Sequence, residues 1–347
     1  MKIIVIACDS YKGCLSSSEV SDAVAEGVSE AYPDCEVVRL AVADGGEGTV
    51  EALVDTLGGH LEWAEVSDPL GRPVRAAYGV AGELAIIESA AACGLTLLSK
   101  EERNPLIATT KGLGELILAA VDKGCTKFLI GLGGSATNDG GMGMIGVEGF
   151  LEKTRGLQFT VACDVDTPYI GKNGASRVFG PQKGASCRDV EILEERLRGY
   201  ALKILEDTGI DVSDMPGAGA AGGLGGAFRA YLGAELKRGV DLVLDQIGFD
   251  SVIAGADLVI TGEGCSDYQT LKGKTAAGVL ERAERQHIPV ALVSGAIRDG
   301  KMLRDSGFHI VEAVTPPSMS LEEAMRPETA KRLVAIATRN ILHHFCI

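Results

Sequence analysis

The sequence predicts an α/β protein in which both chain ends form a flavodoxin-like parallel-sheet domain, with a second α/β domain inserted between them. Short, fully apolar runs such as Ile3 to Ala7 and Val290 to Val293 are typical of buried parallel strands, and helical patterns alternate with them. The length of 347 residues also exceeds the usual size of one core. We place the discontinuous domain at residues 1–66 plus 248–347 and the inserted domain at 67–247.

The N-terminal elements are predicted in the order strand, helix, strand, helix. After the first strand, Ser16 and Glu19 form a capping box that opens a helix, and Pro33 ends it. Glu36 to Val42 is the second predicted strand, and a helix follows from about Thr49 to Leu57. Such an alternation is typical of a parallel sheet that helices cover on both faces.

The inserted segment begins differently. Pro73 to Tyr78 and Leu84 to Glu88 flank a glycine-containing turn and are predicted to form an antiparallel hairpin. Further elements are expected at 110–123 (helix), 127–131 (strand), 189–207 (helix), 257–261 (strand), 275–286 (helix), 290–293 (strand) and 310–314 (strand). We expect the active site in a cleft between the two domains, since ligands commonly bind there.

Composition and charge limit the class of protein. A net charge of −15 with scattered basic residues argues against nucleic-acid binding. The absence of a long apolar run or signal-peptide pattern predicts a cytoplasmic protein without a membrane partner. Nine cysteines without a C-x-x-C pair fit a reduced chain, and His343 and His344 are predicted to be exposed tail residues rather than metal ligands. Homo-oligomerisation is left open.

Four glycine-rich segments predict an enzyme that handles phosphate. Glycine turns let backbone N–H groups approach an anion closely, and neighbouring carboxylates suit Mg²⁺. The four segments are Ala43–Thr49, Gly131–Gly141, Gly217–Gly225 and Thr261–Gly264. Three of these segments place glycines beside acidic or hydroxyl side chains. The excess of glycine is therefore not due to a flexible linker.

Phosphoryl transfer needs positioning, charge neutralisation and a proton acceptor. Asp44 and Asp139 each follow a predicted strand, so either could hold Mg²⁺ or act as the base, although each could also simply cap a helix. Lys12 is the first candidate to neutralise the transferred phosphate, with a solvated lysine as the alternative, and Lys183 is the second. Asp164, at a strand end, is a candidate metal ligand together with Asp139.

The remaining candidates are predicted to bind substrate or phosphate. They are Asp9, Ser10, Gly45, Gly46, Gly133, Gly134, Ser135, Thr137, Asn138, Lys183, Gly217, Gly219, Gly222, Glu263, Asp267, Gln269 and Lys274. For Glu263 and Asp267 the alternative is a turn acid that accepts hydrogen bonds from its own backbone. Lys274 could also do no more than open the helix that follows.

The standard nucleotide-binding motifs are incomplete. A P-loop pattern fails at Gly273 to Thr275 because its first glycine would fall at Tyr268. The pattern G-x-G-x-x-G occurs at Gly217 to Gly222, but no buried strand precedes it. A near-match at Gly131 to Ala136 follows a strand, but polar residues stand where a helix should begin. An NAD-dependent dehydrogenase is therefore the weakest alternative.

Seven segments, in order, resemble the bacterial glycerate kinase family almost end to end. They are Asp9–Gly13 with Leu15 and Ser16, Val42–Thr49, Gly133–Gly141, Ala162–Val165, Phe179–Ala185, Gly217–Gly225, and Gly262–Gly264 with Gln269, Thr270, Gly273 and Lys274. The resemblance implies ATP- and Mg²⁺-dependent phosphorylation of D-glycerate, most often at the 2-hydroxyl to give 2-phosphoglycerate, with 3-phosphoglycerate left open. It also implies a two-domain α/β fold with a flavodoxin-like part.

The sequence departs from the family pattern in three places. Cys265 stands where an arginine usually follows Gly-Glu-Gly, and cysteine cannot supply the two parallel hydrogen bonds of a guanidinium. The chain is shorter than the family between Phe150 and Val161, and Thr167-Pro-Tyr169 replaces Asn-Pro-Leu. These departures motivate a second hypothesis, a non-catalytic or altered-specificity homologue that binds a sugar acid.

Overall fold

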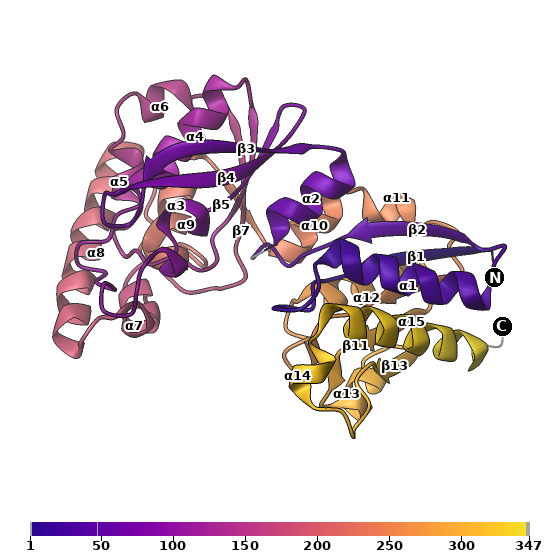
Figure 1. Cartoon of the computed structure of the whole chain (residues 1–347). Coiled ribbons are helices and arrows are strands. Elements are labelled where there is room, and N and C mark those ends of the chain that lie inside the picture. The colour runs from indigo at the N-terminus through magenta and orange to yellow at the C-terminus, as the bar shows by residue number, and fades with distance from the viewer. Residues whose placement is uncertain (1, 47, 345–347) are drawn as a thin grey trace. The chain divides into compact units, whose positions relative to one another are not determined.

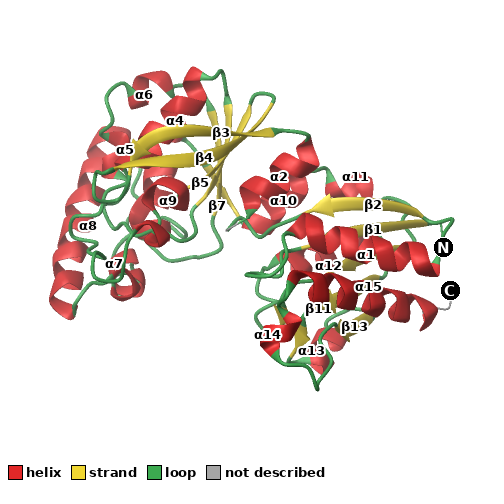
Figure 2. Ribbon diagram, in the orientation of Figure 1, coloured by secondary structure: helices red, strands yellow, loops and turns green. Residues whose placement is uncertain are grey.

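The computed structural model describes residues 2–46 and 48–344, which form two compact units (Figure 1). The terminal unit contains the chain up to Asp44, residues 55–57, and the chain from Val240 onward. The inserted unit contains Gly45–Val54 and Gly58–Gly239. Both units combine helices with parallel strands, so the predicted α/β fold class is confirmed (Figure 2).

The terminal unit is built on a five-stranded sheet in which all neighbouring strands are parallel. Its strands are β1 (Ile3–Cys8), β2 (Glu36–Ala41), β9 (Leu258–Thr261), β11 (Val290–Ser294) and β13 (Ile310–Ala313). They lie in the order β13-β11-β9-β1-β2. In chain order this is 2-1-3-4-5, the flavodoxin-like arrangement, whose strand order reverses between β1 and β9.

The helices of the terminal unit follow the predicted signals. Ser16 accepts a hydrogen bond from the Glu19 backbone N–H (3.2 Å) and Glu19 accepts one from that of Ser16 (3.0 Å), which starts the first helix. The helices are α1 (Ser17–Ala31), α10 (Gly239–Gln246), α11 (Phe249–Val252), α12 (Thr275–Arg285), α13 (Gly300–Asp305), α14 (Leu321–Ala324) and α15 (Pro327–His344). The indigo α1 and the yellow α15 pack side by side (Figure 1), which joins the two chain ends. A two-residue parallel pair, β10 (Cys265–Ser266) with β12 (Ala296–Ile297), completes this unit.

The inserted unit has a six-stranded sheet in the order β3-β4-β5-β6-β7-β8. The strands are β3 (His60–Ser67), β4 (Pro73–Ala81), β5 (Leu84–Glu88), β6 (Lys127–Gly131), β7 (Gln158–Ala162) and β8 (Glu235–Lys237). The predicted antiparallel hairpin is present as β4 and β5, and from β5 to β8 the sheet is parallel. β3 pairs with β4 along its whole length, so this segment belongs to the inserted sheet.

The inserted sheet is covered by helices. They are α3 (Ala90–Cys93), η1 (Leu95–Leu97), α4 (Lys111–Asp122), α5 (Met142–Ile145), α6 (Phe150–Lys153), α7 (Ala175–Phe179), η2 (Pro181–Lys183), α8 (Cys187–Thr208) and α9 (Ala220–Leu232). α2 (Thr49–Leu57) contains residues of both units. Phe128 and Phe159 stack in the core of the inserted unit with ring centroids 4.7 Å apart. None of the helices within the described ranges has the length and apolar character needed to cross a membrane.

Candidate active site

Six predicted site residues line one cavity of the terminal unit, with a volume of about 470 Å³. They are Asp9, Ser10, Lys12, Asp44, Glu263 and Lys274. The cavity opens where β1 and β9 end, which is the point at which the strand order reverses. Open α/β sheets bind ligands at this position because the two neighbouring connections leave the sheet in opposite directions.

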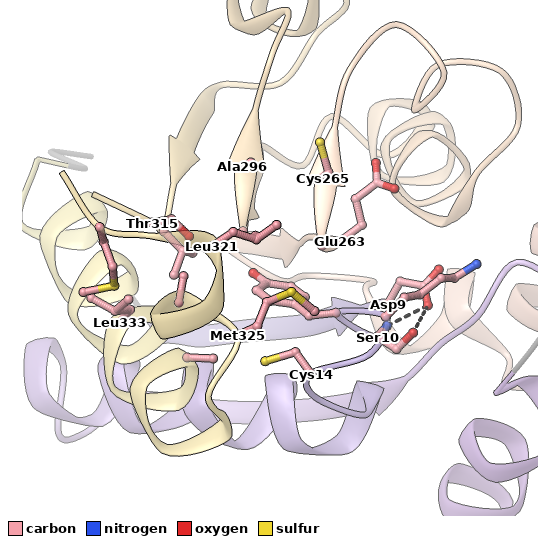
Figure 3. A pocket seen from close by; sticks show the side chains of 18 of the residues that line it. Asp9, Ser10, Cys14, Glu263, Cys265, Ala296, Thr315, Leu321, Met325 and Leu333 are labelled. Atoms are coloured by element: carbon pink, nitrogen blue, oxygen red, sulfur yellow. Dashed lines mark hydrogen bonds between the residues drawn. The ribbon is translucent and has the colours of Figure 1, made fainter. Parts of the chain in front are cut away.

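Asp9 directly follows β1 and is only 7% exposed. One carboxylate oxygen accepts a hydrogen bond from the Thr275 hydroxyl (2.6 Å) and the other accepts one from the Ser10 backbone N–H (2.6 Å). Burial, with a contribution from the charge of Asp44, raises the pKa of Asp9 to about 6. Asp9 is therefore a fixed carboxylate whose ionised form a nearby cation would stabilise (Figure 3).

Glu263 and Lys274 form an ion pair on the same cavity wall. Lys274 Nζ lies 3.1 Å from one oxygen of Glu263, and the other oxygen accepts hydrogen bonds from the hydroxyls of Ser266 (3.0 Å) and Thr270. Burial opposes the charged form of Lys274, but the carboxylates of Glu263, Asp267 and Asp44 outweigh it and raise the pKa of Lys274. The lysine is therefore cationic at neutral pH.

Lys12 is exposed, lines the cavity and forms no ion pair within residues 2–46 and 48–344. Its charge is thus available to an anion. Cys265 also lines the cavity, so the side chain at the position of the family arginine faces this site. Asp267 instead accepts a hydrogen bond from the Gln269 backbone N–H (2.8 Å), which is the turn role given as its alternative.

A second group of predicted residues lies in the inserted unit, around the loop after β6. Lys183 is 2% exposed, and its Nζ donates to the Ser135 hydroxyl (2.9 Å) and the Thr137 carbonyl (2.6 Å). Burial lowers the pKa of Lys183 to about 8. Asn138 Nδ2 donates to the Ser176 hydroxyl (2.9 Å). These contacts favour a structural role in which the buried Lys183 holds the loop after β6 in place.

Asp139 accepts several hydrogen bonds from its own unit and is 8% exposed. One carboxylate oxygen accepts from the backbone N–H (2.8 Å) and hydroxyl (2.9 Å) of Thr110 and from the Gly143 N–H (3.1 Å), and the other accepts from the Gly141 N–H (3.1 Å). Asp164 is exposed and accepts from the Gly239 N–H (2.8 Å). Within the described part of the chain, no group of three or more His, Cys, Asp or Glu could hold a metal. The assignment of Asp139 and Asp164 to a metal stays a prediction.

Close packing of backbone segments accounts for several of the glycines. A side chain on Gly222, whose φ is +74°, would collide with the Thr137 carbonyl, and one on Gly131 would lie 2.6 Å from the Gly45 carbonyl oxygen. Gly219 likewise packs against the Pro168 carbonyl. Other predicted glycines have more room. The nearest atom to an added Cβ lies at 3.6 Å for Gly133, next to Gly46, and at 3.3 Å for Gly134, whereas one on Gly217 would meet the Cys163 sulfur at 3.0 Å.

Sequence reasoning missed two polar residues beside the predicted ones. Glu88 ends β5 and accepts a hydrogen bond from the Val50 backbone N–H (3.2 Å), and burial raises its pKa to about 7. A lone acid at the end of an apolar strand is the same signal that singled out Asp44. Thr275 directly follows Lys274, but its bond to Asp9 joins residues 266 positions apart, which no local pattern reveals.

Comparisons with known proteins agree with this organisation. The model of the Glycerate kinase family matches residues 4–151 and 145–346. The chain belongs to the glycerate kinase family. This confirms the identification from seven sequence segments and, at the level of the family, the prediction of a glycerate kinase, a phosphotransferase.

Relatives match over nearly the full length. The chain is 42% identical to the glycerate 2-kinase of Escherichia coli K12 over 369 positions, covering 97% of this chain and 96% of the relative. It is 43% identical to the glycerate kinase of Bacillus subtilis 168, covering 92% of each. A crystal structure from Salmonella typhimurium LT2, of a protein assigned as glycerate kinase 2, has a TM-score of 0.88 and 41% identity, covering 99% of this chain and 98% of that one.

The comparisons also bear on the shortened middle segment. The alignment with the Escherichia coli protein spans 369 positions whereas this chain has 347 residues, so parts of the relative have no counterpart here. The family model matches in two pieces that meet at residues 145–151. That overlap adjoins the segment between Phe150 and Val161, where the sequence predicts a chain shorter than the family.

Proposed function

We propose that this protein transfers the γ-phosphoryl group of ATP to the 2-hydroxyl of D-glycerate and releases 2-phosphoglycerate and ADP. The observation that carries the proposal is the group of acids and lysines at the point where the strand order reverses, in a chain of this family. Phosphoryl transfer depends on positioning and charge stabilisation more than on covalent chemistry, and this group offers both.

Five charged residues of the cavity have roles in this proposal. Lys12, exposed and free of an ion pair in the described chain, neutralises the transferred phosphoryl group. Lys274, held in place by Glu263, binds a neighbouring phosphate oxygen. Asp44 accepts the proton of the substrate hydroxyl or binds the metal, and Asp9 lies beside it.

The donor set of the cavity fits Mg²⁺. Mg²⁺ is usually held by one or two carboxylates together with phosphate oxygens and water, so a cluster of three acids is not required. Asp9 and Asp44 line the same wall and are close enough for the charge of one to raise the pKa of the other. When bound there, Mg²⁺ would offset charge on the phosphates during transfer. We assign it to this pair in preference to Asp139, which does not line this cavity and whose two oxygens together accept hydrogen bonds from Thr110, Gly141 and Gly143.

A coupled assay of ADP release with D-glycerate and Mg-ATP tests the proposal. The product is identified by ³¹P NMR, because a phosphate on carbon 2 couples to one proton whereas one on carbon 3 couples to two. We expect Lys12→Met to lower kcat by about two orders of magnitude while the control Lys301→Met, an exposed lysine outside the cavity, does not. Nucleotide and glycerate binding without ADP release would instead support the non-catalytic alternative.

The active site between the two domains and the cytoplasmic location stay predictions from the sequence. Turnover of another small hydroxy acid in place of D-glycerate would support altered specificity, for which Cys265 is the motivating residue.

A further inference from the structure

The cavity of the terminal unit has two chemically different halves, and the roles assigned above use only one of them. Its polar half lies at the ends of β1 and β9 and contains the acids and lysines. Its apolar half is formed by Cys14 and by side chains of the segment 314–333. Figure 3 shows Leu321, Met325 and Leu333 on one side of the cavity, away from Asp9 and Glu263.

D-glycerate cannot use the apolar half. Each of its three carbons carries oxygen, so it offers little apolar surface, and burying its polar groups against thioether and leucine side chains would cost free energy. The cavity volume of about 470 Å³ is in the range of pockets that enclose ligands much larger than a three-carbon acid. A larger ligand with one apolar end and one highly charged end fits the whole cavity.

The two halves follow the carboxyl edge of the sheet. From β1 and β9 the lining continues through Gly295 and Ala296, which follow β11, to Val314 and Thr315, which follow β13. An extended ligand placed along this edge would therefore have its anionic end beside Lys12 and its other end beside β13.

We propose that the base of ATP binds in the apolar half, with the triphosphate extending along this edge to Lys12 and Lys274. The inference rests on the proposed function, which supplies ATP as the ligand. The flat faces of a nucleobase pack well against the Met325 thioether and the Leu321 side chain. The Thr315 hydroxyl lines the same half and has no hydrogen-bond partner in the described part of the chain, so it is available to the polar edge of the base.

Two substitutions test the apolar contact without adding charge. Met325 and Leu321 are 38% and 73% exposed, so Met325→Ser and Leu321→Ser should leave the fold intact. We expect the double variant to raise the Kd of a non-hydrolysable ATP analogue with Mg²⁺, measured by calorimetry, about tenfold, and to change the KM for D-glycerate by less than about twofold. Met302→Ser and Leu202→Ser, at side chains 45% and 63% exposed outside the cavity, are matched controls that should bind like wild type. A double variant that binds the analogue as tightly as wild type would overturn the inference.

The Cys14 thiol provides an independent readout. It lines the apolar half, and Cys187 is exposed in the inserted unit and serves as the internal control. We expect the ATP analogue to slow alkylation of Cys14 by N-ethylmaleimide about fivefold or more, as measured by peptide mass spectrometry, and to leave Cys187 unaffected. Inorganic tripolyphosphate or D-glycerate alone should not protect Cys14. Protection by either of them to the same extent as by the analogue would mean that the base does not bind there.

The two proposals fail in different ways. If the analogue protects Cys14 but D-glycerate is not phosphorylated, the base site stands and the acceptor substrate is wrong. If D-glycerate is phosphorylated but the double variant binds the analogue normally, the function stands and the base lies elsewhere.

Discussion

Replacing Asp139 by asparagine separates a structural role from a chemical one. Asparagine keeps one oxygen, which can replace the carboxylate oxygen that accepts from Thr110 and Gly143. Its amide nitrogen then faces the Gly141 N–H, which loses its acceptor. Losing one charge-assisted hydrogen bond and leaving a buried donor unpaired should cost roughly 2–4 kcal/mol of the free energy of unfolding.

We therefore expect Asp139→Asn to lower the melting temperature of the inserted unit by roughly 5–10 °C. Differential scanning calorimetry of the full chain measures this, with Asp214→Asn, an exposed acid, as the control for loss of one charge. Turnover should fall only to the extent that the substitution displaces the loop after β6. A variant with the melting temperature of wild type but a turnover lower by orders of magnitude would refute this reasoning. It would indicate that Asp139 acts directly in catalysis.

Three further predictions follow from the site. Asp44→Asn, in the cavity lining, should lower kcat at least about a hundredfold in the coupled assay, since the general-base and metal roles both depend on the charge. Burial lowers the pKa of Lys183 from 10.5 to about 8, so between these two pH values the unfolded chain binds more protons than the folded chain. The free energy of unfolding of wild type, relative to that of Lys183→Met, should therefore rise from pH 8 to pH 10 in urea unfolding. A difference that does not change with pH would contradict the lowered pKa of the buried lysine. Cys265→Arg should lower the KM for D-glycerate without abolishing turnover, and an unchanged KM would show that the family arginine does not contact the acid in this chain.

Much of the fold could be predicted because its signals are local. Apolar strands such as Ile3–Cys8 lie within a buried parallel sheet, and the capping box at Ser16 starts α1 where expected. No strand was predicted at His60–Ser67, because its residues are largely exposed and its pairing with β4 is decided by the partner strand. The C-terminal helix α15 was also missed, although it packs against α1 and carries part of the cavity wall.

The candidate site was predictable in its residue types but less so in their grouping. Their positions at strand ends identified Asp9, Asp44 and Glu263, the last two next to glycine, and all three line one cavity. The same pattern identified Asp139, where the structure shows a carboxylate surrounded by N–H and hydroxyl donors. The sequence signal is the same for an acid that lines a cavity and for an acid that accepts hydrogen bonds from its own unit, because both lie in turns with exposed N–H groups. Only the positions of the N–H and hydroxyl donors in the structure distinguish the two roles.

The charges of the cavity explain why the loss of the family arginine matters. The lining contains three carboxylates, Asp9, Asp44 and Glu263, and only two lysines, so it does not offset the charge of a bound triphosphate. Lys272 cannot replace the arginine from its present position, because its ammonium lies over the Tyr268 ring at 4.9 Å. In the proposed function, cysteine at position 265 should therefore make the binding of two anionic substrates depend more heavily on Lys12 and on a divalent cation that the acids would hold.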